Sequence, residues 1–503
     1  MAVNKICGIE TEYSIIHKGV EDPNPIWASS MLITSYVKET EQGLRNGIAD
    51  SVVWDFQDET PANDARGFVP IGSLPPIVET HLVNAVLTNG ARFYVDHAHP
   101  EMSTPECQDA LEVARYDKSG ELILREAMQA AKTALPDEEE LVVYKDNSDG
   151  KGNSYGCHEN YLMDRTTPFG NIIRHGIAHF ITRQIYTGSG KIGCEVVGGD
   201  PDAVTYQITQ RADFFEEEVG LETTLKRPII NTRDEPHSDS DRYRRLHVIC
   251  GDANMSEYAT FLKVGSTCLV LAMVEDDYID EDFIFNHPVQ AMKEISYDLS
   301  LSQPIQRENG KSVTALEIQS YLYERAKKYA DEGGLEYVGG EIGNKVLTLW
   351  EEVLTGLETN PTSLHTKIDW IAKKRLLDSF TERHNISYLD ARSRSLAVQY
   401  HDIRESSSIY NKLGMESIIS EKGIEDGVVN PPSGTRAYFR GRCLLKWPDS
   451  IISANWDSIV FKLDDATVKR IPVLDPLKGT KDDVAELIDK CDTPIELIHA
   501  LGI

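Results

Sequence analysis

The sequence predicts an α+β fold, in which strands from distant parts of the chain build a site and helices pack around them. An alternating, strand-like segment opens the chain at Cys7–Tyr13. Further strand-like segments follow at 91–96, 141–144 and 245–250, with the two-residue period of a pleated strand. In the middle third, the segments 315–329, 341–357 and 368–383 repeat apolar residues with the 3.6-residue period of a helix.

Other segments divide the chain into predicted units. We expect a helix from about Ser29, a helix over 108–134 with a break near Gly120, and a helix over 171–186. Residues 43–77 show no clear period, and a stretch of this length is usually a functional loop. We therefore expect a flexible inserted loop there. The segment Pro431-Pro432-Ser433-Gly434 predicts a boundary between residues 1–430 and a small C-terminal domain, 431–503, which ends in a helix over 493–501.

Composition excludes several classes of protein. The 503 residues carry 51 Lys and Arg against 81 Asp and Glu, a net charge of −30, which disfavours general binding to nucleic acid polymers. A polyanionic ligand would need a local basic site. Glu10 and Glu12 interrupt any signal-peptide core, and the most apolar stretch, 269–274, is too short to span a membrane. The eight cysteines form no C-x-x-C pair. We expect a cytoplasmic enzyme with reduced cysteines.

Glu10 and Glu12 are the first candidate site residues. They lie two apart on the opening strand, so both side chains point to one face. Like charges on one face repel unless a cation lies beside them, and Mg²⁺ is commonly held by one or two carboxylates together with substrate phosphates. The alternative is a solvated strand face, and the pair alone does not decide between the two.

A second candidate cluster runs from Asn89 to Glu101. On a strand, Arg92, Tyr94 and Asp96 share a face, and two histidines with Glu101 follow within five residues. A polar turn would also carry such residues, but this density favours a site. The segment 153–161 forms a third cluster, in which His158 and Asn160 share strand parity.

Two basic clusters stand out in this acidic chain. The segment 226–247 holds Arg227 and Arg233 among its basic residues, and arginine suits bidentate contact with phosphate oxygens. Solvated ion pairs with Asp239 and Asp241 are the alternative. The segment 435–442 predicts a strand with Arg436, Tyr438, Arg440 and Arg442 on one face, which favours an anionic partner, either a nucleotide or a protein carboxylate. A P-loop at Gly188–Lys191 is excluded, because Ile192 stands where Ser or Thr should hold Mg²⁺.

At these clusters the sequence resembles the carboxylate–amine ligase branch of the glutamine synthetase superfamily, and most closely the actinobacterial enzymes that act on the ubiquitin-like modifier Pup. The resemblance is ordered along nearly the whole chain. It is carried by the segments Gly8–Tyr13, Leu87–Arg92, Ser154–Tyr161, Leu221–Arg227, Gly251–Asn254 and Thr435–Tyr438. The family implies a curved antiparallel sheet that cradles the active site, helices packed behind it, and a small C-terminal domain after a catalytic domain over 1–430.

Two kinds of enzyme share this framework, a Pup ligase and a Pup deamidase/depupylase. The 43–77 insertion resembles a loop that the hydrolase has and the ligase lacks, in particular at Trp54, Asp64 and Arg66. The spacing Asp96-His97-Ala98-His99-Pro100-Glu101 also resembles the hydrolase. We therefore expect an amidohydrolase that converts the C-terminal Gln of Pup to Glu and cleaves the Pup–Lys isopeptide bond, with an ATP-dependent Pup–protein ligase as the alternative.

The resemblance also implies roles for individual residues. It implies ATP, or ADP with phosphate, and Mg²⁺ as cofactors, and Pup and pupylated proteins as partners. Asp96 is the implied catalytic carboxylate, either as nucleophile or as general base. Arg92 and Arg440 are expected to contact substrate. The implied metal ligands are Glu10, Tyr94, Glu101, His158 and His247, with Glu12 nearby, and the implied nucleotide contacts are Arg227, Arg233 and Arg436.

Overall fold

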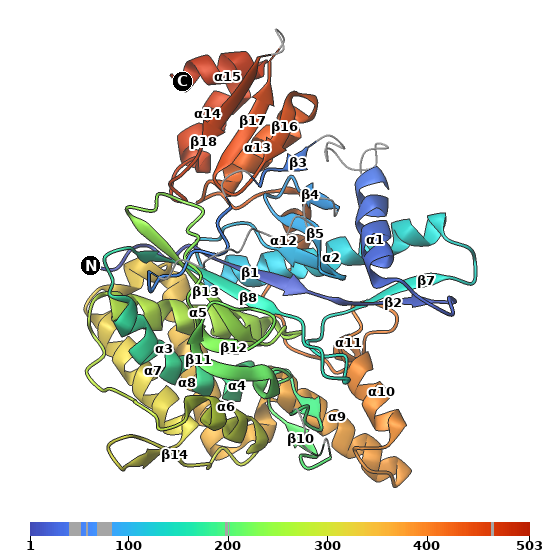
Figure 1. Cartoon of the computed structure of the whole chain (residues 1–503), viewed down its shortest axis with the longest axis vertical. Coiled ribbons are helices and arrows are strands. Elements are labelled where there is room, and N and C mark those ends of the chain that lie inside the picture. Colours follow the sequence, from blue (N-terminus) through green and yellow to red (C-terminus); the bar gives the residue numbers. More distant parts are fainter. Residues whose placement is uncertain are drawn as a thin grey trace.

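A six-stranded antiparallel sheet forms the centre of the molecule (Figure 1). The computed structural model describes residues 1–39, 52–56, 59–67, 83–196, 200, 202–463 and 467–502. Every neighbouring pair of strands in this sheet is antiparallel, so the predicted α+β class with an antiparallel sheet is confirmed. In spatial order the strands are β13 (Tyr243–Gly251), β8 (Cys157–Asp164), β1 (Cys7–Glu12), β6 (His99–Ser103), β5 (Arg92–Asp96) and β4 (Asn84–Val86).

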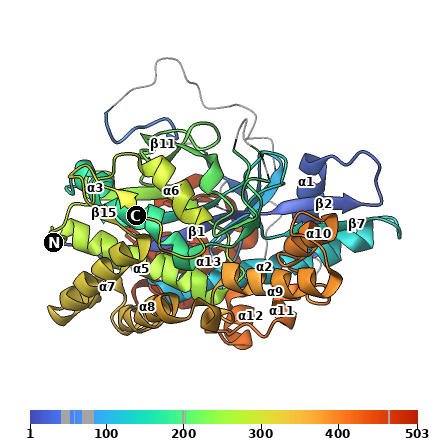
Figure 2. The same cartoon turned by 90° about the horizontal axis from the view of Figure 1, so that it is seen from below.

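Helices cover one face of this sheet. Figure 2 shows α2, α5, α7 and α8 on one side of β1, with β11 on the other side. The predicted helices of the middle third are confirmed with slightly different ends, and the helix expected over 171–186 is present as two consecutive helices. These elements are α3 (Phe169–Thr182), α4 (Gln184–Thr187), α7 (Ala315–Asp331), α8 (Glu341–Thr359) and α9 (Asp369–His384).

Helix α2 (Ala110–Ala134) is continuous, so the break predicted near Gly120 is wrong. Gly120 is instead a packing residue: a Cβ atom at this position would lie 3.0 Å from Cγ of Met102 on strand β6. A side chain there would push the helix away from the sheet. The glycine therefore sets a close contact between helix and sheet and does not interrupt the helix.

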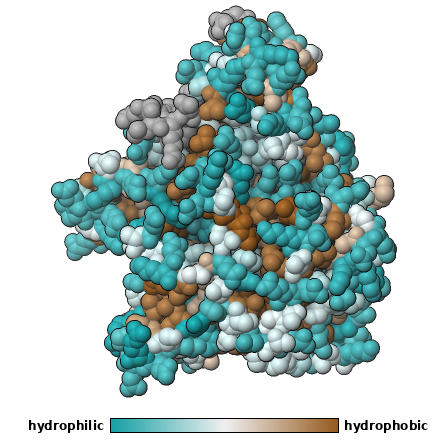
Figure 3. Space-filling model, turned by 180° about the vertical axis from the view of Figure 1, so that it is seen from behind, coloured by the Kyte–Doolittle hydropathy of each residue, from teal (hydrophilic) through white to brown (hydrophobic). Residues whose placement is uncertain are grey.

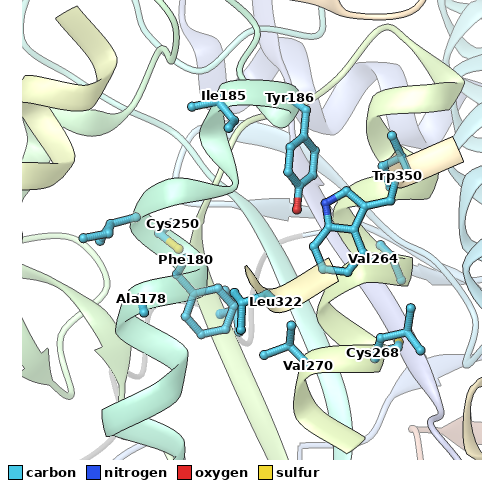
Figure 4. Close-up of a cluster of buried hydrophobic side chains, with 14 of the residues drawn as sticks. Ala178, Phe180, Ile185, Tyr186, Cys250, Val264, Cys268, Val270, Leu322 and Trp350 are labelled. Carbon is cyan, nitrogen blue, oxygen red and sulfur yellow. The ribbon is translucent and has the colours of Figure 1, made fainter. Parts of the chain in front are cut away.

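Helix α5 (Glu257–Glu275) was not predicted, because its continuous apolar sequence has no amphipathic period. By length and composition it could cross a membrane, but 94% of its most apolar window is buried inside the fold, as in the core helix of a soluble protein. It contributes Val264, Cys268 and Val270 to the large core, where they lie near Trp350 of α8 (Figure 4). The Tyr186 hydroxyl in this core donates a hydrogen bond to Gln319 Oε1 at 2.9 Å.

The last part of the chain forms a second, four-stranded sheet with its own apolar core (Figure 1). Its strands are, in order, β18 (Val468–Pro472), β17 (Ser458–Lys462), β16 (Ile451–Ala454) and β3 (Val53–Trp54). β3 comes from the 43–77 insertion and pairs in parallel with β16. The domain boundary near 431 stays a prediction, and so does the flexibility of the insertion, of which residues 43–51, 57–58 and 68–77 lie outside the described residues. The helices of this part are α13 (Ala437–Lys446), α14 (Lys481–Lys490) and α15 (Pro494–Ala500).

Smaller elements complete the fold. The predicted strand 141–144 lies in β7 (Glu140–Tyr144), which pairs with β2 (Ser14–Lys18), and the first helix, α1 (Pro25–Glu39), begins four residues before the expected start. On the face seen in Figure 3 the surface is mostly hydrophilic, with apolar patches near its centre. The remaining helices are α6 (Pro288–Tyr297), α10 (Ala391–Gln399), α11 (Ile409–Lys412) and α12 (Glu421–Val429). The remaining strands are β9 (Lys191–Ile192), β10 (Tyr206–Gln207), β11 (Phe215–Gly220), β12 (Arg227–Asn231), β14 (Ile305–Gln306) and β15 (Ser312–Val313).

Candidate active site

The open face of the central sheet carries the predicted site. Along β1, Cys7, Ile9 and Thr11 are buried, whereas Gly8, Glu10 and Glu12 are partly exposed on the opposite face. Glu10 and Glu12 therefore share a face, as predicted. The strand register places Glu10 opposite His158 on β8 and Glu12 opposite Glu101 on β6. Residues from distant parts of the chain thus meet because their strands are neighbours.

Glu10, His158 and His247 form a first group, which we call the histidine cluster. One possible ligand atom from each of the three lies within 4.8 Å of the other two. His158 Nδ1 is 3.8 Å from Glu10 Oε2, and the two imidazole rings are 5.0 Å apart at their centroids. Burial raises the pKa of Glu10, but the interaction with His158 and the nearby positive side chains outweigh it and lower the pKa below its ordinary value. Glu10 is therefore ionised.

His247 is prepared to bind a cation. Its ring is 2% exposed, and burial together with the neighbouring Arg245 lowers its pKa well below the ordinary value, so the imidazole is neutral. Its Nε2 is buried and has no hydrogen-bond partner among the described residues. A buried nitrogen without a partner is costly unless it binds a ligand. Two imidazole nitrogens and a carboxylate therefore fit a divalent cation at the histidine cluster.

Glu12, Asp96 and Glu101 form a second group, the carboxylate cluster, with one oxygen from each within 4.8 Å of the others. Burial and the charges of Asp96 and Glu12 raise the pKa of Glu101 well above its ordinary value. Three carboxylates at this separation repel one another in the absence of a cation. An all-oxygen group of this kind is the donor set that Mg²⁺ prefers, so the residues fit this ion.

The predicted ligand set is therefore divided between two groups, which sequence spacing did not reveal. Glu101 lies with Glu12 and Asp96, and not with Glu10 and the two histidines. Tyr94 lies opposite Glu101 in the register and hydrogen-bonds to its carboxylate. Burial raises the pKa of the Tyr94 phenol well above its usual range, so the hydroxyl keeps its proton. Tyr94 is thus placed as a hydrogen-bond donor to Glu101, and its assignment as a metal ligand stays a prediction.

Asp96 occupies the end of β5, at a two-residue turn that leads into β6. The turn residue His97 has a φ of 52°, and its Nδ1 lies 2.8 Å from Asp96 Oδ2. Burial raises the pKa of Asp96, but the hydrogen bond and charge of His97 outweigh it, so the pKa lies below the ordinary value. The hairpin holds an ionised Asp96 within the carboxylate cluster and beside the histidine cluster.

Arg227 and Arg233 lie on different sides of the site. Arg227 donates through Nη2 to the Ser154 carbonyl at 3.0 Å, and burial together with Arg211 lowers its pKa to about 10. Arg233 lies close enough to His247 and Arg245 for its charge to lower the pKa of both. Its buried Nε has no partner among the described residues. Each guanidinium therefore retains the capacity to bind an anion near the sheet face.

The segment 435–442 is not a strand, and this prediction is wrong. Arg436 immediately precedes helix α13, and residues four apart share a helix face, so Arg436 and Arg440 both reach Glu106. Arg440 is 2% exposed and also donates to the carbonyls of Trp456 and Gly90. A contact with substrate would require breaking these bonds, and the assignment of Arg440 as a substrate contact stays a prediction. Of the two alternatives for the anionic partner, the protein carboxylate is the one present.

Arg436 nevertheless lines an open pocket of about 580 Å³, counted together with the solvent at its mouth, between the sheet face and the C-terminal part. The pocket has an apolar floor from β1 and β8 and several polar side chains at its edge. The lining includes Glu10 of the histidine cluster, so pocket and cluster are continuous. The other polar or aromatic residues at its edge are Asn160, His237, Arg245 and Trp456.

The described part of the insertion packs against the site. Trp54 is 2% exposed, lies against Trp456 with ring centroids 5.1 Å apart, and donates from Nε1 to Glu59 Oε1 at 2.7 Å. The Arg92 guanidinium lies between Trp54 and Tyr94, 4.0 and 3.9 Å from the two ring centroids. This stacking orients Arg92, whose predicted contact with substrate stays a prediction.

Asp64 and Arg66 anchor a second part of the insertion. Asp64 accepts a bidentate pair from Arg66 and forms a β-bridge with Arg233. Burial raises the pKa of Asp64, but the bonds from Arg66 outweigh this and the pKa is lowered. The insertion therefore reaches both the C-terminal sheet, through Trp54, and the arginine side of the site, through Asp64.

Replacing Trp54 with phenylalanine should loosen the segment 52–56 without unfolding the protein. The ring contact with Trp456 is largely kept, whereas the hydrogen bond to Glu59 is lost, at a cost of about 1 kcal/mol. Hydrogen–deuterium exchange of residues 52–56 should then rise about fivefold. Trp27→Phe is the control, because Trp27 is half-exposed and stacks on His17, away from the insertion. Equal exchange in Trp54→Phe and the parent protein would contradict the anchoring role.

Sequence reasoning missed three residues that organise the site. Asn160 contacts both Glu10 and His247, Arg245 holds Asn160, and Glu106 binds the two arginines at the C-terminal part. The parity that Asn160 shares with His158 placed it on the right face but gave it no role. Nothing in the sequence connects Glu106 to residues more than 300 positions away.

Comparisons with known proteins agree with this geometry. The family model for Pup-ligase protein matches residues 5–460. Over 510 residues the chain is 44% identical to a depupylase from Acidothermus cellulolyticus, covering 99% of each chain. Over 508 residues it is 42% identical to the Pup deamidase/depupylase of Mycolicibacterium smegmatis, covering 99% of this chain and all of that one. A Pup–protein ligase from Kineococcus radiotolerans is 38% identical over 81% of this chain and 90% of its own.

Two solved structures have the same fold. The crystal structure of the complex between Pup and its ligase PafA superposes with a TM-score of 0.79 at 29% identity, covering 99% of this chain and 93% of that one. The structure of the Pup ligase PafA in complex with ADP gives a TM-score of 0.75 at 31% identity, covering 88% and 99%. Sequence and structure agree over the full length, and the chain belongs to the Pup-ligase protein family.

Proposed function

We propose that this chain is a hydrolase that deamidates the C-terminal Gln of Pup to Glu and cleaves the isopeptide bond between Pup and a protein lysine. The observation that carries the proposal is an ionised Asp96, held within the carboxylate cluster and beside the histidine cluster on the open sheet face. Full-length similarity at 42–44% identity to proteins named depupylase and Pup deamidase/depupylase supports hydrolysis over ligation. The ligase relative matches only 81% of the chain.

The substrate groups share one chemistry, which Asp96 suits. A C-terminal Gln and a Glu–Lys isopeptide both present a γ-carboxamide, so one site can hydrolyse both. The Asp96 carboxylate attacks this carbonyl carbon as a nucleophile, or removes a proton from an attacking water as a general base. Its lowered pKa keeps it unprotonated at neutral pH, as either role requires. His97 holds the carboxylate through its 2.8 Å hydrogen bond.

We further propose that a nucleotide, ATP or ADP with phosphate, lies in the 580 Å³ pocket and that Mg²⁺ accompanies it. The ADP complex of a relative with the same fold supports a nucleotide, and the donor atoms described above suit a divalent cation. One cation would be held at the histidine cluster, by Glu10, His158 and His247. At the carboxylate cluster, Glu12 and Glu101 would offer carboxylate oxygens to Mg²⁺. Bound Mg²⁺ would supply positive charge for phosphate oxygens and for the developing oxyanion. Arg227 and Arg233 would add contacts to phosphate, and Arg436 would remain a pocket wall fixed by Glu106.

Pup itself would approach an enzyme with a net charge of −30. Binding of an acidic partner then depends on local positive side chains, because the overall field is repulsive. Arg92, fixed between Trp54 and Tyr94 on the second strand from the edge of the sheet, is the best-placed candidate to meet a carboxylate of Pup. We also propose that the protein acts in the cytoplasm, which its eight unpaired cysteines support.

One assay tests the function and separates it from the ligase alternative. The protein is incubated with ATP, Mg²⁺ and Pup ending in Gln, and in parallel with Pup ending in Glu and an acceptor protein. Release of ammonia and a mass gain of about 1 Da on Pup are the expected results, since an amide becomes an acid. Attachment of Pup-Glu to the acceptor with no ammonia released would establish the ligase. If neither product forms, both the hydrolase and the ligase functions are overturned.

Chelation tests the metal separately. Excess EDTA should reduce ammonia release to background, and added Mg²⁺ should restore it, because the carboxylate cluster is repulsive without a cation. Circular dichroism before and after chelation serves as the control for folding. Full activity in EDTA would remove Mg²⁺ from the proposal and leave the assignment of Asp96 in place.

A further inference from the structure

The side-chain amide of Asn160 joins three groups of the site. Its Nδ2 donates to Glu10 Oε1 at 2.8 Å, and its Oδ1 accepts from Arg245 Nη1 at 2.5 Å. His247 Nδ1 lies 3.0 Å from the same oxygen. Asn160 is on β8, directly opposite His247 on β13 and diagonal to Glu10 on β1. It therefore contacts two of the three members of the histidine cluster.

The chemistry of these partners fixes the orientation of the amide. Arginine can only donate, so the atom that faces Arg245 must be the amide oxygen. The Glu10 oxygen accepts at 2.8 Å, so the atom that faces Glu10 is the amide nitrogen. Both conditions select the same orientation. In the reversed amide, the nitrogen would face the donor Arg245 and the oxygen would face the acceptor Glu10.

The fixed amide oxygen also acts on the proton of His247. Nδ1 of this ring lies 3.0 Å from Asn160 Oδ1, which accepts, and 3.2 Å from Arg245 Nη1, which donates. The shorter contact, to the amide oxygen, favours a hydrogen on Nδ1 and the lone pair on Nε2. That nitrogen is the buried atom without a hydrogen-bond partner among the described residues. One nitrogen of the His247 ring lies within 4.8 Å of possible ligand atoms of Glu10 and His158. Histidines that bind metals commonly donate their other ring N–H to such an acceptor, which orients the ring.

Arg245 holds Asn160 in turn. Its Nε donates to the Glu235 carbonyl at 2.7 Å, and its Nη2 lies 3.5 Å from the Glu235 carboxylate. The Arg245 guanidinium is thereby fixed by Glu235 as well as by Asn160. The Asn160 amide is in turn held between Arg245 and Glu10. A side chain locked in this way sets the positions of Glu10 and His247 before any ligand arrives.

We propose that Asn160 is a positioning residue that presents Glu10 and the Nε2 lone pair of His247 to a divalent cation. This inference rests on the proposed metal site and adds the residue that organises it. A residue that only stabilised strand β8 would change the stability of the fold but would leave the tautomer of His247 and the affinity for metal unchanged.

The first test measures binding of Mn²⁺ alone, by electron paramagnetic resonance, to the full-length protein. Asn160→Ala should raise the Kd for Mn²⁺ by 10- to 100-fold, the usual effect of removing a partner of a metal-bound histidine. The control is Asn153→Ala, because Asn153 is exposed and its side chain bonds to the neighbouring surface residue Asp149. Unchanged Mn²⁺ affinity in a folded Asn160→Ala protein would overturn the proposal.

The second test does not depend on the folding of Asn160→Ala. Nitrogen-15 NMR of the parent protein labelled at histidine should show His247 protonated at Nδ1, with the signal assigned by its loss in His247→Gln. A proton on Nε2 instead would overturn the proposal. These tests are independent of the proposed reaction. The parent protein could fail to deamidate Pup and still bind Mn²⁺, with weaker Mn²⁺ binding in Asn160→Ala. That result would reject the function and keep the positioning role. Absence of Mn²⁺ binding in the parent protein would reject both the metal site and the role of Asn160.

Discussion

Replacing Asp96 with asparagine is expected to reduce the rate of Pup-Gln deamidation by about 10²- to 10⁴-fold, the contribution of a positioned general base, or more if the carboxylate is the nucleophile. Asparagine has nearly the same shape and cannot accept a proton at neutral pH or form an anhydride. The rate is measured as ammonia released in a single turnover, with enzyme in excess of Pup.

Nucleotide binding should survive this change, because Asp96 does not line the 580 Å³ pocket. An ADP titration by calorimetry measures it directly. Asp137→Asn is the matched control, since Asp137 is exposed at the surface and far from the sheet face. Deamidation by Asp96→Asn at the parent rate would remove Asp96 from the mechanism, whereas loss of both activity and ADP binding would indicate a general disruption of the site.

The strand periods allowed much of this site to be predicted from sequence. A period of two fixes which side chains share a face, so Glu10 with Glu12, and Arg92 with Tyr94 and Asp96, were placed correctly on their strands. Period alone does not state which strands are neighbours. The separation of Glu101 from Glu10 depends on the register of β1 against β6, which is set by tertiary packing.

The segment 435–442 shows where the period is ambiguous. Arg436 and Arg440 are four residues apart, and this spacing puts two side chains on one face of a strand and also on one face of a helix. The choice was decided by Glu106, a buried acceptor that two consecutive turns of a helix can reach together. Helix α5 was missed for a related reason, because a fully buried helix has no polar face to reveal its period.

The insertion was only partly predictable. The missing period predicted an inserted loop but not its docking, and Trp54 packs into the core of the C-terminal sheet. The partners of that contact, Trp456 and β16, lie about 400 residues away in the sequence. Local sequence carries no information on a pairing of this kind. The entropy lost on closing the loop depends on the length of chain between the partners, and the contact energy depends on a surface formed by other segments.

Replacing Glu106 with glutamine should lower the free energy of unfolding by about 3 kcal/mol. The carboxylate side chain is 12% exposed and accepts from Arg436 Nε at 2.8 Å and from two nitrogens of Arg440. Without its charge, two buried guanidiniums face each other with no counter-ion, and removing one partner of a buried ion pair typically costs about 3–5 kcal/mol. Urea denaturation followed by the fluorescence of Trp447 and Trp456 reports on this part of the chain, and the exposed Glu138→Gln should change stability by less than about 0.5 kcal/mol.

The same ion pairs predict how stability depends on pH. Burial raises the pKa of Glu106, but Arg440 and Arg436 outweigh it and lower the pKa from 4.5 to about 2. A carboxyl group with a depressed pKa stabilises the fold fully above its unfolded pKa, and the contribution is lost as the pH falls toward the folded pKa. A shift of this size corresponds to about 3 kcal/mol, in agreement with the cost expected for the substitution. The stability difference between the parent protein and Glu106→Gln should therefore be constant above about pH 5 and disappear between about pH 4.5 and pH 2. A difference that persists unchanged at low pH would show that the glutamine acts through packing and not through the lost charge.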